Sequence, residues 1–227
     1  MRDIKEFYEM WNIEELPEYM KILIKFADEL IFEEISSILS DFKVKDPLVL
    51  DCGCGFGAFY KLTETFNTIY LDISLNMLKK FTMTEKKICG NILHLPFKDK
   101  TFDLILCINV LEHVDKSKAL KEINRVLKDN GRVIVVVINK NCLFREEVFN
   151  DFRVFHKAMG VDDFISEFKV LKYTSTYFLP PIVKILPRSV LLKVLKPWKW
   201  IDKKLSKIFK GKGQFLIVEL EKAKVRH

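Results

Sequence analysis

The sequence predicts an α/β fold in which a doubly wound, mostly parallel sheet is covered by helices on both faces. Short apolar runs alternate with amphipathic helical segments between residues 46 and 138, which is the pattern of parallel strands joined by crossover helices. The run 132–138 is dominated by β-branched residues and therefore predicts a central strand. The first run, 48–50, enters a glycine-rich turn, as does the strand beside a ligand site in such folds.

Length and composition favour one globular domain. The chain has 227 residues, 49% of them hydrophobic and 30% charged, so we expect a single domain over 1–227 rather than two independent cores. The first residues lack the apolar core of a secretory signal, and the longest apolar stretch is far shorter than the roughly 20 residues that span a bilayer. We therefore expect a cytoplasmic protein with no transmembrane segment.

The individual elements follow from changes in the hydrophobic period. Apolar residues at three-to-four spacing predict a long N-terminal helix over 15–42. The strands predicted after it are 48–50, 68–71, 87–89, 102–108 and 132–138, and the helices are 74–81, capped by Ser74, and 116–127, ended by Asn130-Gly131. Two last strands, 168–174 and 214–219, are expected to finish the sheet, the second antiparallel at or near its edge.

The glycine-rich turn carries the strongest functional signal. Gly53, Gly55 and Gly57 are spaced by two between a strand and a predicted helix, directly after Asp51, so the backbone can approach a ligand closely. A dinucleotide site has the spacing GxGxxG, and a phosphate-binding P-loop continues with GK[ST]. This turn has neither pattern. A carboxylate beside the turn also repels pyrophosphate and suits a cationic ligand.

This segment resembles motif I of the class I S-adenosylmethionine-dependent methyltransferases, and further motifs of that family follow in order. Asp72 ends the second strand 21 positions after Asp51, residues 89–97 resemble the third motif, and residues 102–114 resemble the fourth. The helix and strand over 120–138 resemble the elements that come next. The likeness to the broad group called methyltransferase type 11 implies a seven-stranded, Rossmann-like methyltransferase fold.

The resemblance also implies a binding site for S-adenosyl-L-methionine. It assigns the methionine end of this cofactor to Asp51 and the amides around Gly53, Cys54 and Gly55, and it counts Gly57 of the same turn among the cofactor-binding residues. The ribose is assigned to Asp72, the adenine surroundings to Ile73, Asn91 and Ile92, and the donor end to Asn109. The family usually has Asp at position 91, and the amide of Asn91 accepts a hydrogen bond without charge assistance. Taken singly, these residues also fit caps and turns, so the assignment depends on their occurring together.

The implied reaction is direct displacement, in which an acceptor nucleophile takes the donor methyl and alignment supplies much of the acceleration. A general base is needed only where the acceptor arrives protonated. His113 is the leading candidate because it follows the fourth strand, although a His there also serves as a cap. His94 and His156 are weaker candidates. Related enzymes that bind a divalent ion have a Glu-x-x-Glu-His pattern, but the first position here is Asn109, so no metal is expected.

The segments outside the core are expected to select the acceptor. The chain divides into an N-terminal helical region over 1–45, a cofactor-binding core over 46–138, a variable acceptor or lid region over 139–213, and a last strand with a tail over 214–227. The variable region is rich in aromatic residues: Phe144, Phe149, Phe152, Phe155, Phe164, Phe168, Tyr173, Tyr177 and Phe178. Such a region fits a lid over an apolar acceptor and equally fits core packing.

The excess positive charge is local. The whole chain carries +7, whereas residues 178–213 hold ten basic residues and one acidic residue, so this segment carries +9 and the remainder −2. From Pro197 to Gly211 the pattern places one apolar and one basic stripe on a helix: Trp198, Ile201, Leu205, Ile208 and Phe209 against Lys199, Lys203, Lys207 and Lys210. The hypothesis is a peripheral dock on an anionic membrane. A cap over the domain and nucleic-acid binding are the alternatives.

The expected function is methyl transfer to a small-molecule acceptor, with a lipid-like or isoprenoid acceptor as the specific hypothesis. An RNA-directed methyltransferase and a non-catalytic cofactor-binding protein are the alternatives, while the glycine spacing disfavours a dehydrogenase. The five cysteines lack metal-ligand spacing and are interpreted as reduced small hydrophobes. The methylated atom and the oligomeric state are left open.

Overall fold

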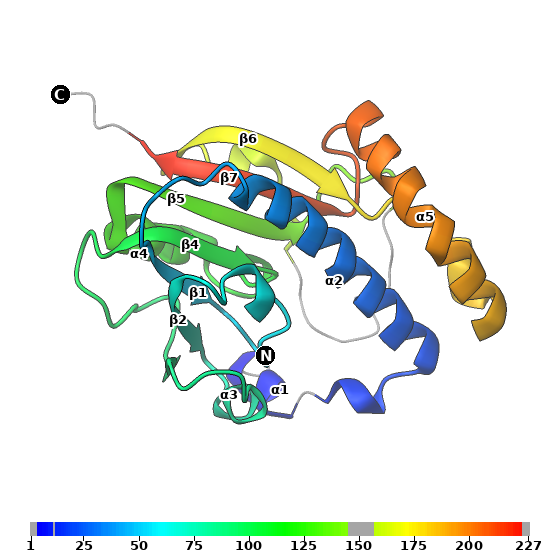
Figure 1. Cartoon of the computed structure of the whole chain (residues 1–227), viewed down its shortest axis with the longest axis horizontal. Coiled ribbons are helices and arrows are strands. Elements are labelled where there is room, and N and C mark those ends of the chain that lie inside the picture. Colours follow the sequence, from blue (N-terminus) through cyan, green and yellow to red (C-terminus); the bar gives the residue numbers. More distant parts are fainter. Residues whose placement is uncertain (1–3, 11, 145–156, 224–227) are drawn as a thin grey trace.

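The computed structural model describes residues 4–10, 12–144 and 157–223. One seven-stranded sheet runs through the molecule in the order β3-β2-β1-β4-β5-β7-β6 (Figure 1). The strands are β1 (Leu48–Cys52), β2 (Asn67–Asp72), β3 (Lys87–Cys89), β4 (Phe102–Ile108), β5 (Leu127–Ile138), β6 (Phe168–Thr176) and β7 (Phe215–Lys222). β1 to β5 pair in parallel, and β7 is antiparallel to both β5 and β6. The predicted seven-stranded, mostly parallel sheet is confirmed.

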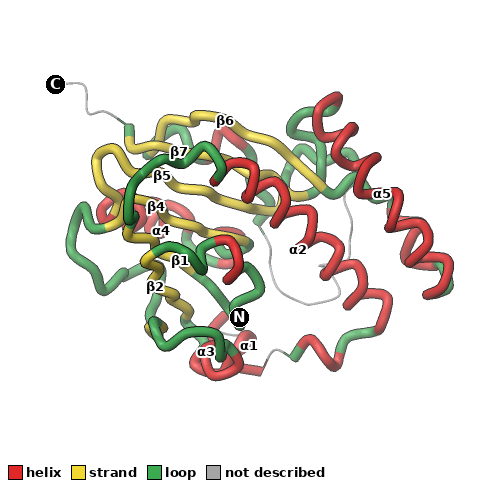
Figure 2. Tube along the Cα trace, in the orientation of Figure 1, coloured by secondary structure: helices red, strands yellow, loops and turns green. Residues whose placement is uncertain are grey.

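Helices cover both faces of this sheet. They are α1 (Ile4–Met10), α2 (Glu18–Leu39), α3 (Leu75–Lys80), α4 (Lys116–Val126) and α5 (Arg188–Ile208). α2 and α5 lie in front of the sheet in Figure 2, and α4 lies behind it. Alternate side chains of β4 supply the two cores, because successive residues of a strand point to opposite faces. Ile105 and Cys107 join the cluster that contains α4, whereas Leu104 and Leu106 join the cluster that contains α2 and α5.

Two of the predicted boundaries are wrong. No α-helix follows the glycine-rich turn, because Gly53, Gly55 and Gly57 all have positive φ, a backbone region outside the right-handed helix. Turns and one 3₁₀ segment, Tyr60–Leu62, take its place. Asn130-Gly131 does not end a helix, because α4 already ends at Val126 and these two residues lie within β5.

The cysteines are all free thiols. Cys52, Cys54 and Cys107 are buried, as expected for small hydrophobes, whereas Cys89 is exposed and Cys142 is partly exposed. The prediction that all five fill apolar packing positions is therefore wrong for Cys89. Among the described residues, no helix combines the length and apolarity that a bilayer crossing requires.

The basic segment forms one helix that starts earlier than predicted and packs on the domain. α5 runs from Arg188 through Pro197 to Ile208. Leu191 and Leu195 are buried in the cluster that contains α2 and α5, which we call the front core, and Trp198 packs against this cluster. Of the predicted apolar stripe, Trp198 contributes to this packing, whereas Ile208 and Phe209 at its end are 70% and 44% exposed.

A buried carboxylate fixes α5 to the end of β6. Asp202 is 1% exposed, and it accepts hydrogen bonds from the Thr176 hydroxyl at 2.6 Å, from the Tyr177 amide at 3.1 Å and from the Phe178 amide at 2.7 Å. Buried donors of this kind need a hydrogen-bond acceptor, because neither water nor another protein group can replace the acceptor when it is removed.

Asp202→Ala removes that acceptor from three buried donors. We expect the free energy of unfolding to fall by roughly 2–4 kcal/mol, given a cost of about 1–3 kcal/mol for each buried group left unsatisfied. Chemical denaturation followed by circular dichroism measures the change. The control is Glu221→Ala, which breaks the exposed pair with Lys169 and is expected to cost less than about 1 kcal/mol. A similarly small loss for Asp202→Ala would contradict this account of α5.

Candidate active site

Two adjoining cavities open where β1 and β4 end. They share lining residues from the glycine-rich turn, from α1 and from the segment after β4: Tyr8, Gly53, Gly55, Phe56, Asn109 and His113. Because β1 and β4 are parallel neighbours, the residues that follow them meet at one edge of the sheet. We call the space of about 180 Å³ beside β2 the first cavity and the space of about 260 Å³ beneath α2 the second cavity.

The first cavity contains the residues predicted for the nucleoside part of a cofactor. Asp72, Ile73 and Ile92 line it, together with Val110. The Asp72 carboxylate accepts hydrogen bonds from the amides of Gly55 and Ser74, both at 2.8 Å. These two bonds fix the carboxylate at the end of β2, where an acidic side chain can accept from ribose hydroxyls.

The glycine-rich turn leaves room for a ligand. Gly53 has φ +84°, and a Cβ there would lie 2.2 Å from a methyl of Val110, so only glycine fits. Gly55 has φ +55°, and a Cβ there would meet no atom within 4 Å. The space in front of Gly55 belongs to both cavities. The turn therefore has the open, close-approach surface that the cofactor requires.

The predicted amide contacts of this turn are wrong. The amides of Gly53 and Cys54 donate to the Leu71 carbonyl at 2.7 and 3.0 Å, and the Gly55 amide donates to Asp72. The Gly57 amide donates to the Cys54 carbonyl. All four donors are used within the protein, so the turn offers its Cα surface and carbonyl groups instead.

Three of the predicted site residues lie behind the lining. Asp51 is 3% exposed and lines neither cavity, and burial together with the nearby Asp72 raises its pKa to about 7. Asn91 uses its side-chain oxygen to accept from the Leu93 amide at 2.9 Å. Gly57 has φ +85° and packs on the ring of Phe81. Each of the three shapes the backbone that carries the cavity walls.

The second cavity is mainly apolar. Its wall comes from α1, α2, the residues after the glycine-rich turn and the start of β7, and it includes Phe7, Met20, Leu23, Ile24, Phe59 and Phe215. From the variable region 139–213, Tyr177 is the described residue that takes part. The expectation that this region covers the acceptor thus falls largely on residues 145–156, which, with Phe149, Phe152, Phe155 and His156, lie outside the described residues.

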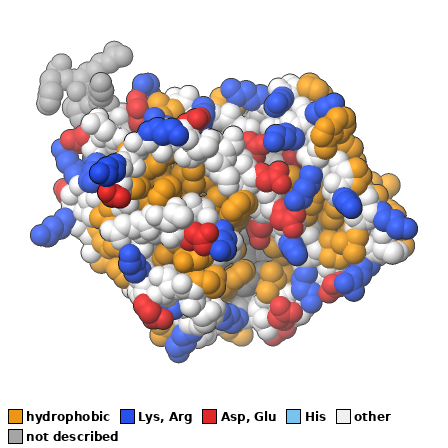
Figure 3. Space-filling view, in the orientation of Figure 1, with side chains coloured by type: hydrophobic (Ala, Val, Ile, Leu, Met, Phe, Trp, Pro, Cys, Tyr) orange, Lys and Arg blue, Asp and Glu red, His pale blue; other side chains and the backbone are white. Residues whose placement is uncertain are grey.

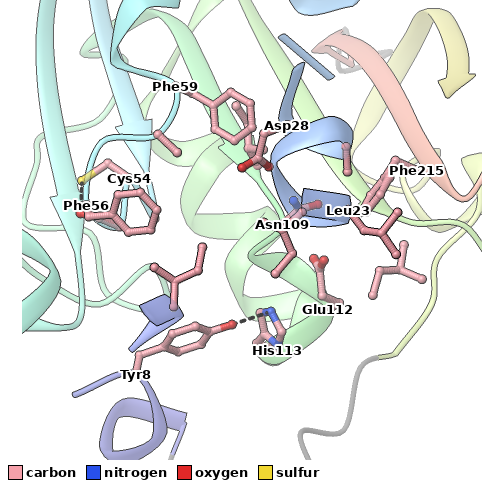
Figure 4. A pocket seen from close by; sticks show the side chains of 18 of the residues that line it. Tyr8, Leu23, Asp28, Cys54, Phe56, Phe59, Asn109, Glu112, His113 and Phe215 are labelled. Atoms are coloured by element: carbon pink, nitrogen blue, oxygen red, sulfur yellow. Dashed lines mark hydrogen bonds between the residues drawn. The ribbon is translucent and has the colours of Figure 1, made fainter. Parts of the chain in front are cut away.

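A few polar side chains point into this apolar space. Figure 4 shows Asp28 from α2 and Glu112 from the segment after β4 on either side of Asn109. Burial raises the pKa of Glu112 to about 8. Burial and the adjacent Glu29 raise the pKa of Asp28 to about 7. No Lys or Arg belongs to the described lining of either cavity.

α1 lies across the boundary between the two cavities. The Tyr8 hydroxyl and Nε2 of His113 share a hydrogen bond of 2.9 Å (Figure 4). The Glu9 carboxylate accepts from the amides of Leu75 and Asn76 at the start of α3, at 2.8 and 3.2 Å. His113 lines both cavities, whereas His94 lines neither, and the role of His113 as a base stays a prediction.

Sequence patterns did not identify Tyr8, Asp28 or Gln214 as lining residues. Asp28 and Glu29 stand together between the apolar positions Ala27 and Leu30 of an amphipathic helix, so the sequence offers no signal that separates Asp28 from a solvent-facing acid. Glu112 entered the sequence argument only as part of a metal pattern. Among the described residues, no three His, Cys, Asp or Glu side chains converge as metal ligands.

Comparison with known proteins identifies the family of the chain. Residues 50–135 match the family model described as a methyltransferase domain. An uncharacterised protein of Methanocaldococcus jannaschii is 62% identical over 98% of this chain and 100% of its own length. The human protein named probable tRNA methyltransferase 9B is 33% identical over 40% of this chain and 21% of its own length.

A solved structure shares the fold. The SAM-dependent methyltransferase of Thermotoga maritima, described as a possible histamine N-methyltransferase, superposes with a TM-score of 0.65 at 18% identity, over 97% of this chain and 100% of that one. The chain belongs to the class I S-adenosylmethionine-dependent methyltransferases. It is an enzyme whose cofactor is S-adenosyl-L-methionine.

The buried carboxyls make the stability of the cofactor-free protein depend on pH. The pKa values of Asp28 and Asp51 are raised to about 7 and that of Glu112 to about 8, whereas unfolded carboxyls titrate near 4. Between these values the folded state binds more protons than the unfolded state, so stability is lost as pH rises through that window.

We therefore expect the free energy of unfolding to fall from about pH 5 to about pH 8. Asp28→Asn removes one of the linked protons, so its curve should be flatter than that of the wild type over the same window. Denaturant titrations at several pH values measure both curves. Parallel curves for the two proteins would show that Asp28 ionises normally.

Proposed function

We propose that the methyl acceptor is a small molecule with a mostly apolar body, bound in the second cavity. The observation that carries this proposal is the wall of that cavity, which is built from aromatic and aliphatic side chains with a few polar groups among them. Sites for small organic ligands have this composition, because apolar burial supplies affinity and the polar groups fix orientation. A lipid-like or isoprenoid chain and a compact aromatic molecule both fit this description.

In this arrangement the cofactor occupies the first cavity and reaches the shared residues. Asp72 binds the ribose, Ile73 and Ile92 contact the adenine, and Asn109 with the turn over 53–55 holds the methionine end. The bound cofactor supplies an activated methyl group on a sulfonium ion. The acceptor nucleophile would then attack from the second cavity, and His113, which shares a hydrogen bond with Tyr8, would take the proton of a hydroxyl acceptor.

The lining favours this acceptor over RNA. Nucleic-acid sites depend on Lys and Arg contacts to phosphates, and the described lining holds neither residue. α1 and α2 also contribute lining on the side away from the sheet, so a nucleotide would have to be extruded from its strand to enter. The tRNA-related name of one relative belongs to a protein of which this chain covers 21%.

A labelling experiment tests the acceptor class. The protein is incubated with methyl-labelled S-adenosylmethionine and an extract of Methanocaldococcus jannaschii, the source of the relative with 62% identity. We expect label in the small-molecule or organic-soluble fraction, and Ile24→Trp, which fills the second cavity, should remove it. Label that appears in RNA instead would contradict the proposal, and unchanged labelling by Ile24→Trp would place the acceptor elsewhere.

We further propose that the outer side of α5 and the turn before it rest on an anionic lipid surface. Ile182 and Ile185 are 64% and 79% exposed in that turn, and Trp200 is 64% exposed on the helix. Figure 3 shows hydrophobic and basic side chains interspersed at the right of this face, where α5 lies. The Lys204 ammonium lies 3.5 Å from the centre of the Trp200 ring. Apolar insertion together with lysine attraction is characteristic of interfacial helices.

Vesicle flotation tests this docking. We expect wild-type protein to float with vesicles of phosphatidylglycerol and phosphatidylcholine at about 0.1 M salt and to stay behind with phosphatidylcholine alone, because each lysine gains about 1 kcal/mol near an anionic surface. Ile185→Ser with Trp200→Ser should abolish flotation. The control Met83→Ser removes another exposed apolar side chain, 49% exposed, away from α5. Absence of flotation would overturn the membrane assignment. Retention of the protein on RNA in place of vesicles would overturn it as well.

A further inference from the structure

The second cavity contains hydrogen-bond acceptors that no group of the described residues satisfies. Oε2 of Glu112 and Oε1 of Gln214 are buried and have no hydrogen-bond partner among the described residues, and Oδ1 of Asn109 at the cavity boundary is in the same state. Glu112 and Gln214 are 2% and 3% exposed. Buried polar atoms are nearly always paired, so three such oxygens around one space require a ligand that brings donors.

A carboxyl group adds to these acceptors. Asp28 extends from α2 into the same cavity, toward Asn109 in Figure 4. Within the part of the chain that the structure describes, no hydrogen bond or ion pair involves its side chain, and the described lining contains no Lys or Arg to balance its charge. Burial of a charged carboxylate without a cation is costly, so the pKa values of Asp28 and Glu112 are both raised in this cavity, and a bound cation would favour their charged forms.

The cofactor does not account for all of these groups. In the proposed arrangement its methionine ammonium would be held at the shared residues, by Asn109 and the carbonyls of the turn. Asp28, Glu112 and Gln214 line the second cavity and are absent from the first. Their acceptor oxygens therefore face the space that remains for the molecule that is methylated.

We propose that this molecule is an amine, which enters as an ammonium ion and is recognised by Asp28, Glu112 and Gln214. The proposal rests on the function proposed above and narrows its acceptor class. An ammonium ion supplies donors to three oxygens and one positive charge to the carboxylates. An alcohol or a carbon nucleophile supplies at most one donor and leaves the carboxyls unbalanced.

The same groups complete the transfer step. The ammonium passes one proton to the Asp28 carboxylate, which leaves a lone pair on nitrogen. This lone pair forms the new C–N bond with the donor methyl while the C–S bond breaks, and the electron pair of that bond stays on sulfur. The product is a methylated ammonium ion and a neutral thioether, so charge and atoms balance without any further reactant. A carboxylate that titrates near neutral pH suits this proton transfer.

Calorimetry with a matched pair of probes tests the proposal. Phenethylamine and 2-phenylethanol have nearly the same shape and differ in the charged group. We expect the complex of wild-type protein with S-adenosylhomocysteine to bind the amine at least tenfold more tightly than the alcohol. Asp28→Asn should reduce that preference by at least tenfold, with the affinity for S-adenosylhomocysteine unchanged. Glu112→Gln is a second neutral variant of nearly equal size, and Asp41→Asn, at an exposed site after α2, is the control.

Each outcome has one meaning. Equal binding of the amine and the alcohol would overturn the amine assignment and leave the small-molecule cavity intact. Binding of neither probe would overturn the proposed acceptor cavity itself. A loss of S-adenosylhomocysteine binding in Asp28→Asn would show that this carboxylate binds the cofactor, and it would also overturn the proposal.

Discussion

The site depends on one topological constraint, namely that β1 and β4 are parallel neighbours from which the chain departs in opposite directions. After β1 the chain turns toward β2, and after β4 it turns toward β5, so a crevice opens between them. Both departures use left-handed backbone, at Gly53 with φ +84° and at Asn109 with φ +55°. The ligand-facing groups of both cavities are arranged around these two residues.

The N-terminal elements convert this crevice into an enclosed site. α2 packs on the front core through Ile31 and Ile35. The first turns of α2 form part of the apolar wall of the second cavity. α1 contributes Tyr8, whose contact with His113 joins the cover to the catalytic edge of the sheet. Burial in this site raises the pKa values of Asp28 and Glu112, whose side chains line the second cavity.

The sequence predicts the fold well because strand burial and period leave strong patterns. The runs at 102–108 and 132–138 and the long N-terminal helix are found almost where the structure has them. The backbone after β1 is harder to predict. Three glycines with positive φ and the turns that follow them take the place of the helix that the sequence pattern implies. The roles of Tyr8, Asp28 and Gln214 could not be predicted, since their position in the cavity results from tertiary contacts between elements far apart in the chain.

The central claim is that the crevice in front of Gly55 holds the methionine end of the cofactor, and titration calorimetry with S-adenosylhomocysteine tests it most directly. A methyl group at Gly55 would project into that empty space. Gly211 also has positive φ, at +74°, and lies away from the site beside Tyr173, so Gly211→Ala controls for backbone strain. We expect one site per wild-type chain, an affinity at least tenfold weaker in Gly55→Ala, and wild-type affinity in Gly211→Ala. Equal affinity in Gly55→Ala and the wild type would contradict the account.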